Sequence, residues 1–394
     1  MSLMKKQPYI VVLLLSVLLL VTACGGDSTF DQSDEVDNAE NGEFISAKEV
    51  AITQPRVGIY NVKGYRLVYV TRDNDGKKLK ASGLLLIPQK DSSKKSPLLS
   101  YQHGTHFEDK NVPSNDPSAI PEIAGRGFIV SAPDYIGYGE SASHPNTYIH
   151  AKSYANAVVD MLRASKSFLK SQNITINEQL FLAGYSEGGY ATLAAQKAIQ
   201  EEYSNEFIVT ASSPGAGPYD LSSTAKIIFN QETNESPAFL SFVIKTYNDI
   251  YGLKAIDEMY QAQYVDAINT LFDGEHSGGE ISSELNEVTS QLFRPVFLAT
   301  LQGSGQHVLK DRLAENNIHD WKPNAPTRFF HSNYDEIVPY QNTENAIQAM
   351  NDRDATNISL GSCELGILGS HVRCVPFYLT DTIEFFSNYN PELK

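Results

Sequence analysis

A serine, an aspartate and a histidine stand in the chain where they could act together as nucleophile, orienting acid and base. Ser186 lies in "AGYSEGGYAT", between Gly184 and Gly188. A G-x-S-x-G pentapeptide matches by chance in about one chain in ten of this length, so its context decides its meaning. The apolar run at 179–186 ends in Ser186 and a helical pattern at 187–202 follows it. This strand–turn–helix context predicts a nucleophile elbow.

The residues around the serine suit such a turn. Gly184 and Gly188 lack a Cβ, so the chain can turn sharply around a strained residue. A helix that begins at Glu187 directs its free N–H groups and its dipole toward the serine. We expect the backbone N–H of Glu187 to donate to an oxyanion. Its acidic side chain should then point away from the site or be held by a partner.

The partners of the serine follow it in the order acid, then histidine. Asp335 in "FFHSNYDEIVPY" comes just after an apolar strand, and His371 in "GSHVRC" lies between the last predicted strand and the final helix. In this interpretation His371 takes the proton of Ser186, and Asp335 fixes the imidazole tautomer. Glu336 is the rival acid, but Asp335 lies nearer the strand end. We interpret His331, inside the predicted strand, as a packed residue.

A second oxyanion donor is expected in "YQHGTHFED", after the apolar run at 97–102. Gly104 or Thr105 is the candidate, and His103 would shape the loop. The alternative for this segment is a plain turn. We find no group of cysteines and histidines with metal-binding spacing, so the sequence predicts no metal and no cofactor.

Strands and helices alternate along the chain, which predicts an α/β fold with a mostly parallel sheet covered by helices on both faces. Helices are expected at 150–171, at 187–202 and within 375–388. Two early antiparallel strands are expected at 65–73 and 78–88. Further strands are expected at 97–104, 127–134, 179–186, 207–217, 327–335 and 355–363.

Residues 219–324 interrupt this alternation and show no clear strand pattern. The stretch 238–272 has helical apolar spacing and seven aromatic residues. We interpret residues 219–324 as an inserted helical cap, a lid over the site, within a core formed by residues 49–218 and 325–394. The alternative is a set of extra helices on the sheet surface.

The N-terminal residues resemble an export signal. Lys5 and Lys6 precede a short apolar run at 9–21, and the sequence around Cys24 resembles the lipobox of bacterial lipoproteins. Residues 1–23 would be removed and Cys24 lipidated, so that the acidic segment 24–48 tethers the domain to a bacterial membrane. Gly25 favours the outer membrane. The alternative is an ordinary secretory signal.

Charge and cysteine content narrow the function further. The formal net charge of -16 becomes -18 once the two lysines of residues 1–23 are removed, which disfavours binding to nucleic acid.

Cys363 and Cys374 bracket His371, and in an oxidising compartment their pairing is expected. Two unrelated buried thiols are the alternative.

The segments "SYQHGT", "SAPDYIGYGES", "AGYSEGGYAT", "SNYDEIVPY" and "GSHVRC" together resemble the secretory lipase family of lipase A type, within the α/β-hydrolase superfamily. The resemblance runs from about Val57 to the end of the chain. It implies a serine esterase or lipase with a helical cap, acting on a small-molecule or lipid ester. Asp134, Tyr135, Gly137 and Gly139 match the family's strand-end turn. We read them as structural, because Asp134 precedes Ser186.

Two other functions remain as alternatives. Serine peptidases of the prolyl oligopeptidase type share the triad order, but only about 75 residues separate Cys24 from "SYQHG", too few for their β-propeller. Small aminopeptidases with helical caps stay open. A non-catalytic surface lipoprotein is disfavoured because all three triad residues are present. The acyl chain, the alcohol, the membrane face and the oligomeric state are left open by the sequence.

Overall fold

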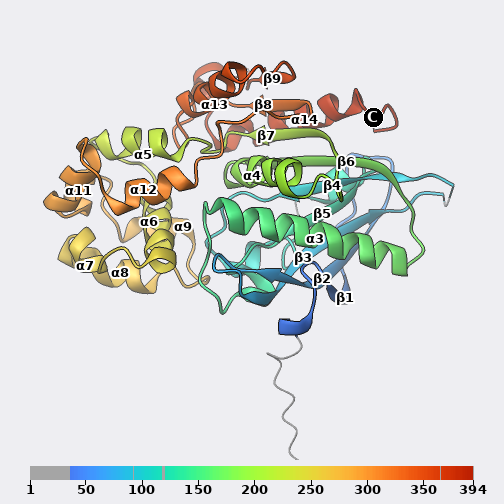
Figure 1. The fold of residues 1–394 in the computed structure, drawn as a ribbon, viewed down its shortest axis with the longest axis horizontal. Coiled ribbons are helices and arrows are strands. Elements are labelled where there is room, and N and C mark those ends of the chain that lie inside the picture. Colours follow the sequence, from blue (N-terminus) through green and yellow to red (C-terminus); the bar gives the residue numbers. More distant parts are fainter. Residues whose placement is uncertain (1–35, 92, 118–119, 364, 394) are drawn as a thin grey trace, which may run out of the picture.

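The computed structural model describes residues 36–91, 93–117, 120–363 and 365–393. In this part of the chain a nine-stranded sheet forms the centre of the molecule (Figure 1). Its strands are β1 Phe44–Val50, β2 Val62–Arg72, β3 Lys78–Pro88, β4 Ser96–Gln102, β5 Ile129–Pro133, β6 Ile176–Tyr185, β7 Val209–Gly215, β8 Thr327–Phe330 and β9 Ile358–Gly361.

The strand order is β1-β2-β3-β5-β4-β6-β7-β8-β9. β1, β2, β3 and β5 pair antiparallel, whereas β5, β4 and β6 to β9 run parallel. The sheet is therefore mostly parallel, as the sequence predicted. The strand order reverses around β4 and β6, and in open α/β sheets ligands bind at the carboxyl ends of strands at such a point.

Helices cover both faces of the sheet. The side chains of Leu180 and Leu182 in β6 pack in a cluster with α3 (Ala151–Ser171) and α4 (Glu187–Glu202). The alternate side chains of Phe181 and Ala183 pack in a second cluster with residues of α2 (Pro121–Ala124) and α14 (Val375–Ser387). Successive side chains of a strand point to opposite faces, so a strand that is buried on both faces has apolar residues at successive positions. This explains the apolar run at 179–185.

Several elements were not expected from the sequence, among them the short helix α2, the strand β1 and the helix α13 (Gln341–Asp352). β1 is an edge strand whose side chains are mostly exposed, so it lacks the apolar alternation that marks a half-buried strand. It begins at Phe44, so the predicted end of the tether at residue 48 is wrong.

The predicted signal peptide, residues 1–23, and Cys24 lie outside the described residues. Among those described, no helix has the length and apolarity needed to cross a membrane.

The chain between β7 and β8 forms a group of helices at one end of the sheet (Figure 1). We call it the cap. Its helices pack in one apolar cluster with core residues such as Tyr190 of α4. They are α5 Leu221–Asn230, α6 Pro237–Tyr251, α7 Ile256–Met259, α8 Val265–Thr270, α9 Gly278–Ser283, α10 Thr289–Leu292, α11 Pro295–Gln302 and α12 Val308–Glu315.

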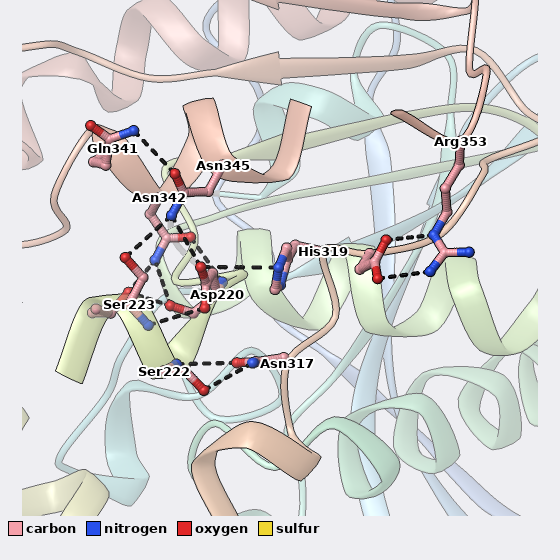
Figure 2. A network of polar contacts seen from close by, with 11 residues as sticks. Asp220, Ser222, Ser223, Asn317, His319, Gln341, Asn342, Asn345 and Arg353 are labelled. Carbon is pink, nitrogen blue, oxygen red and sulfur yellow. Dashed lines mark hydrogen bonds and ion pairs between the residues drawn. The ribbon is translucent and has the colours of Figure 1, made fainter. Parts of the chain in front are cut away.

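A polar network joins the two ends of the cap to the core (Figure 2). The amide of Asp220, at the start of the cap, donates to Oδ1 of Asn342 in α13 at 3.0 Å, and the Asp220 carboxylate accepts from Asn345 at 3.0 Å. Asn317, after α12, accepts from the amide of Ser222 at 3.1 Å. Entry and exit of the cap are thereby bonded to each other and to the helix that follows β8.

Candidate active site

Ser186 forms the tight turn between β6 and α4. Its φ of 62° lies in the left-handed region, which is strained for a residue with a side chain. The Ser186 amide donates to the carbonyl of Gly215 at 2.8 Å and holds the turn. A Cβ on Gly184 would lie 2.4 Å from the Gly188 carbonyl oxygen, and one on Gly188 would lie 2.1 Å from that of Gln102. Both positions therefore require glycine, as an elbow demands.

The elbow is braced from the far end of the chain. The Tyr378 hydroxyl, on α14, accepts a hydrogen bond from the Gly184 amide at 2.7 Å and donates one to the Ser213 carbonyl at 2.6 Å. The Tyr378 side chain is fully buried. Sequence reasoning missed Tyr378, because nothing in its local sequence indicates a partner almost 200 residues away.

Ser186, His371 and Asp335 lie in hydrogen-bond contact. The Ser186 Oγ is 2.8 Å from Nε2 of His371, and Nδ1 of His371 is 2.5 Å from Oδ2 of Asp335. The three residues follow β6, β9 and β8, so the carboxyl ends of parallel strands bring them to one edge of the sheet. This arrangement can remove a proton from the serine and stabilise the resulting imidazolium.

The Asp335 carboxylate is fixed by four groups. Its Oδ1 accepts from the amides of Ile337 at 3.0 Å and Val338 at 2.8 Å, while His331 and His371 contact its Oδ2. Burial raises the pKa of this carboxyl, but hydrogen bonds and charge from the two histidines outweigh it and hold the pKa well below its usual range. Asp335 therefore stays ionised, as an orienting acid must.

His331 is buried, as expected of a packed residue, but it also contacts the acid. Its Nε2 lies 3.1 Å from Asp335 Oδ2 and 3.1 Å from the Val338 carbonyl oxygen. Both neighbours are acceptors, so Nε2 carries a proton. The other nitrogen, Nδ1, lies 2.7 Å from the Thr343 hydroxyl. A second histidine thus steadies the carboxylate that contacts His371.

The loop that carries His371 is held at several points. Cys363 and Cys374 form a disulfide around it, with a Cα–Cα distance of 5.7 Å. The Tyr185 hydroxyl donates to the His371 carbonyl at 2.9 Å. Glu336, the rival acid, accepts from the His371 amide at 3.0 Å. The Glu336 carboxylate therefore positions the backbone of this loop, while Asp335 contacts the imidazole.

The expected oxyanion donors lie around the elbow. Glu187 is the first residue of α4, and a Cβ on Gly104 would lie 3.9 Å from the Ser186 Cβ. The amides of Glu187 and Thr105 donate no backbone hydrogen bond within the described ranges, so both are free for a ligand. His103 supports this loop, since its ring stacks on Tyr135 at 4.1 Å.

The acidic side chain of Glu187 is held by a partner. It is only 2% exposed, and its Oε1 accepts from the Tyr154 hydroxyl of α3 at 2.5 Å. Burial raises the pKa of Glu187 to about 8, although the hydrogen bond from the Tyr154 hydroxyl and the nearby Thr105 hydroxyl favour the charged form. At neutral pH the carboxyl beside the elbow is therefore largely uncharged.

Asp134 has a structural environment, as predicted. Its fully buried carboxylate accepts from the hydroxyls of Ser82 and Ser114, both at 2.6 Å, and from the Ser114 amide at 2.8 Å. It does not contact His371, whose acid partner is Asp335.

A cavity of about 110 Å³ begins at Ser186 and extends into the cap. Apolar side chains of α5, α6 and α12 form most of its wall, together with residues of the core. The lining residues from the cap are Leu221, Thr224, Ala225, Ile228, Phe229, Asn234, Ser236, Phe239, Leu240, Val243, Ile244, Leu309 and Leu313.

Comparison with known proteins identifies the family of the chain. The model of the family described as "Secretory lipase" matches residues 112–372, well over half of the chain. A secreted triacylglycerol lipase, LIP2, of Malassezia furfur is 22% identical over 80% of this chain and 68% of its own length.

Solved structures show the same fold. The rice cell wall degrading esterase LipA of Xanthomonas oryzae superposes with a TM-score of 0.80 at 24% identity, over 87% of this chain and 97% of its own. Candida antarctica lipase A superposes with a TM-score of 0.69 at 19% identity, over 90% and 83% respectively. The chain belongs to the secretory lipase family, and it is a carboxylic-ester hydrolase with the α/β-hydrolase fold.

Proposed function

We propose that the protein hydrolyses carboxylic esters through an acyl-enzyme on Ser186, with His371 as base and Asp335 as orienting acid. The observation that carries this proposal is the continuous contact from Ser186 Oγ through His371 to Asp335, at 2.8 and 2.5 Å. These are the distances at which a base can take a proton from a nucleophile.

The reaction then proceeds in two halves. Ser186 Oγ attacks the ester carbonyl carbon while His371 Nε2 takes the hydroxyl proton. The carbonyl oxygen becomes an oxyanion that the amides of Glu187 and of Thr105 or Gly104 can stabilise. When the tetrahedral intermediate collapses, His371 gives the proton to the departing alkoxide, which leaves as the alcohol. A water molecule, deprotonated by His371, attacks the acyl-enzyme, and when this second tetrahedral intermediate collapses His371 returns the proton to Ser186 Oγ and the acid leaves.

The cavity supports an apolar acyl group. Its cap wall is formed mainly by aliphatic side chains and two phenylalanines, Phe229 and Phe239. Of the acidic residues of the cap, none lines this cavity. We therefore propose that the acyl chain extends from Ser186 between α5 and α6, and that residues 219–324 serve as the lid of the core formed by residues 44–218 and 325–394.

We also propose that the protein is exported and held at a bacterial membrane by a lipid on Cys24, with the outer membrane favoured. The secretory lipase family supports export. The support for the anchor is the sequence before Cys24 and the acidic segment after it. Mass spectrometry of the mature N-terminus tests the anchor: a diacylated Cys24 is expected, and a free N-terminus elsewhere contradicts it.

The experiment that tests the reaction is a panel of aryl esters with acyl chains of two to sixteen carbons, run with wild type and Ser186→Ala. Wild type should release the phenol, and Ser186→Ala should lose that activity by a factor of about 10³ or more. Full activity in the variant would exclude the serine mechanism. Peptide anilides serve as the control, since release of aniline at a comparable rate would indicate a peptidase.

A further inference from the structure

Glu187 is a buried titratable group beside the elbow, and its side chain takes no part in the proposed reaction. The Glu187 side chain has one oxygen, Oε1, that accepts a hydrogen bond from Tyr154, whereas the buried Oε2 accepts none. A buried carboxylate oxygen without a donor is strongly disfavoured. Oε2 would instead be satisfied as a donor, if the carboxyl carries a proton there.

The hydrogen bonds around Glu187 show which group donates in the contact between the Tyr154 hydroxyl and Glu187 Oε1. The Tyr154 hydroxyl accepts from the Ile149 amide at 2.9 Å, so its own proton is free to go to Glu187 Oε1. The Thr105 hydroxyl is the other polar group that acts on the Glu187 carboxyl. Thr105 also contacts the Tyr148 hydroxyl at 2.9 Å. The carboxyl thus lies between α3 and the loop after β4.

Among the described residues, the titratable groups that interact with the charge of Glu187 are tyrosines, which are uncharged at neutral pH. Burial lowers the pKa of His103 to about 3, and it lowers the pKa of His106 as well, so both rings are neutral at neutral pH. Burial also raises the pKa of the neighbouring tyrosines, and the charge of Glu187 contributes to that shift. They are Tyr135, Tyr138, Tyr148 and Tyr154. The ring nitrogens of His371 contact the Ser186 Oγ and the Asp335 carboxylate.

We propose that Glu187 is a positioning residue whose neutral carboxyl accepts from Tyr154 at Oε1 and donates from Oε2 to the Thr105 hydroxyl. The contact holds the loop of Gly104 and Thr105 against the N-terminus of α4, where the oxyanion forms. This inference rests on the proposed serine mechanism. It assigns the side chain of Glu187 a role distinct from that of its backbone N–H.

Ionisation of Glu187 would remove the proton that Oε2 donates. It would also place a negative charge next to the oxyanion. Both effects destabilise the tetrahedral intermediate more than the bound ester, so kcat should fall at alkaline pH while KM changes little. Since burial raises the pKa of Glu187 to about 8, this fall belongs in the mildly alkaline range.

The test compares kcat and KM for a soluble aryl ester between pH 6 and pH 10 in wild type, Glu187→Gln and Glu187→Met, after subtraction of the Ser186→Ala rate. Wild-type kcat should fall about tenfold per pH unit above the ionisation. Glu187→Gln keeps an acceptor and a donor but cannot ionise, so its kcat should stay within about tenfold of wild type and should not fall. Glu187→Met should lose kcat at every pH with KM little changed.

A double variant makes the link to the loop measurable. Thr105→Val and Glu187→Met break the same contact, so the double variant should lose no more kcat than the worse single variant. Three results would each overturn the inference. The kcat losses of the two single variants could add up in the double variant. Glu187→Gln could be as slow as Glu187→Met, or its kcat could fall at alkaline pH as that of wild type does. These outcomes leave the serine mechanism intact, because that mechanism is tested separately by the loss of hydrolysis in Ser186→Ala.

Discussion

The Nε2 of His331, just after the end of β8, lies 3.1 Å from the carboxylate oxygen of Asp335 that also contacts His371. The two histidines therefore share one carboxylate oxygen, while the other oxygen accepts from two amides. The orientation of Asp335 depends on this full set of donors. The contact of Asp335 with His371 thus has a support that lies entirely within the core.

Replacing His331 should slow the chemical step. In His331→Phe the Asp335 carboxylate loses one donor, and a hydrogen bond to a charged group is worth about 1.5–3 kcal/mol. We expect kcat to fall about tenfold or more with KM unchanged, and His331→Gln, which keeps an N–H donor, to retain more activity. Steady-state kinetics on one aryl ester check this. A Phe variant with wild-type kcat would show that Asp335 needs no such support.

The disulfide should stabilise the loop that carries His371. Cys363 and Cys374 close a loop with a sequence separation of 11, for which chain entropy gives about 3 kcal/mol. The Cys363→Ser/Cys374→Ser variant should unfold at lower urea concentration and lose activity at a lower temperature than wild type. Equal urea midpoints for wild type with and without reductant would argue against this role, provided that thiol titration shows complete reduction.

The stability of the protein should depend on pH through Glu187. Its pKa is raised to about 8 in the folded state, against a usual value near 4.5. Between these values the folded state binds the proton and the unfolded state does not, so this group makes stability fall as pH rises. The slope reaches about 1.4 kcal/mol per pH unit. Glu187→Gln removes it, so the variant should gain free energy of unfolding relative to wild type from pH 5 to pH 8.

Urea unfolding at each pH measures the difference in free energy of unfolding between Glu187→Gln and wild type. Glu201→Gln, on the exposed part of the same helix, is the control for the change in net charge. If the difference in free energy of unfolding between Glu187→Gln and wild type does not change with pH, Glu187 is already ionised in the folded protein at pH 5.

The cavity in the cap should set the acyl preference. Val243 of α6 lines it, and a phenylalanine there would fill part of its 110 Å³. Val243→Phe should lower kcat/KM for esters of long acyl chains while leaving acetyl and butyryl esters within about threefold of wild type. Val296→Phe, on the outer surface of the cap where Val296 is 79% exposed, is the matched control. If Val243→Phe lowers kcat/KM equally for every acyl chain length, the acyl group binds elsewhere.

The sequence predicted the parts of the site that follow from order along the chain. Ser186, Asp335 and His371 each follow an apolar run, and a parallel sheet brings the ends of such runs together. The glycines of the elbow were predictable because a Cβ at Gly184 or Gly188 would collide with backbone. These inferences need only local pattern and the topology of the sheet.

The remaining support could not be predicted because it depends on packing between distant segments. Tyr378 meets Gly184, and Tyr154 meets Glu187, only after α14 and α3 have packed on opposite faces of the sheet. A buried tyrosine in a helix looks the same in sequence whether or not its hydroxyl serves a site. β1 was missed for a related reason, since its exposed side chains leave no apolar pattern.

The most direct test of the central proposal is covalent labelling by an aryl phosphonate ester that resembles the tetrahedral intermediate. Mass spectrometry of wild type should show one phosphonyl group on the peptide that contains Ser186, with ester hydrolysis lost in proportion to labelling. Ser186→Ala should remain unlabelled and inactive. A label on another residue that abolishes hydrolysis, or full hydrolysis by a wild-type protein labelled at Ser186, would contradict the serine mechanism.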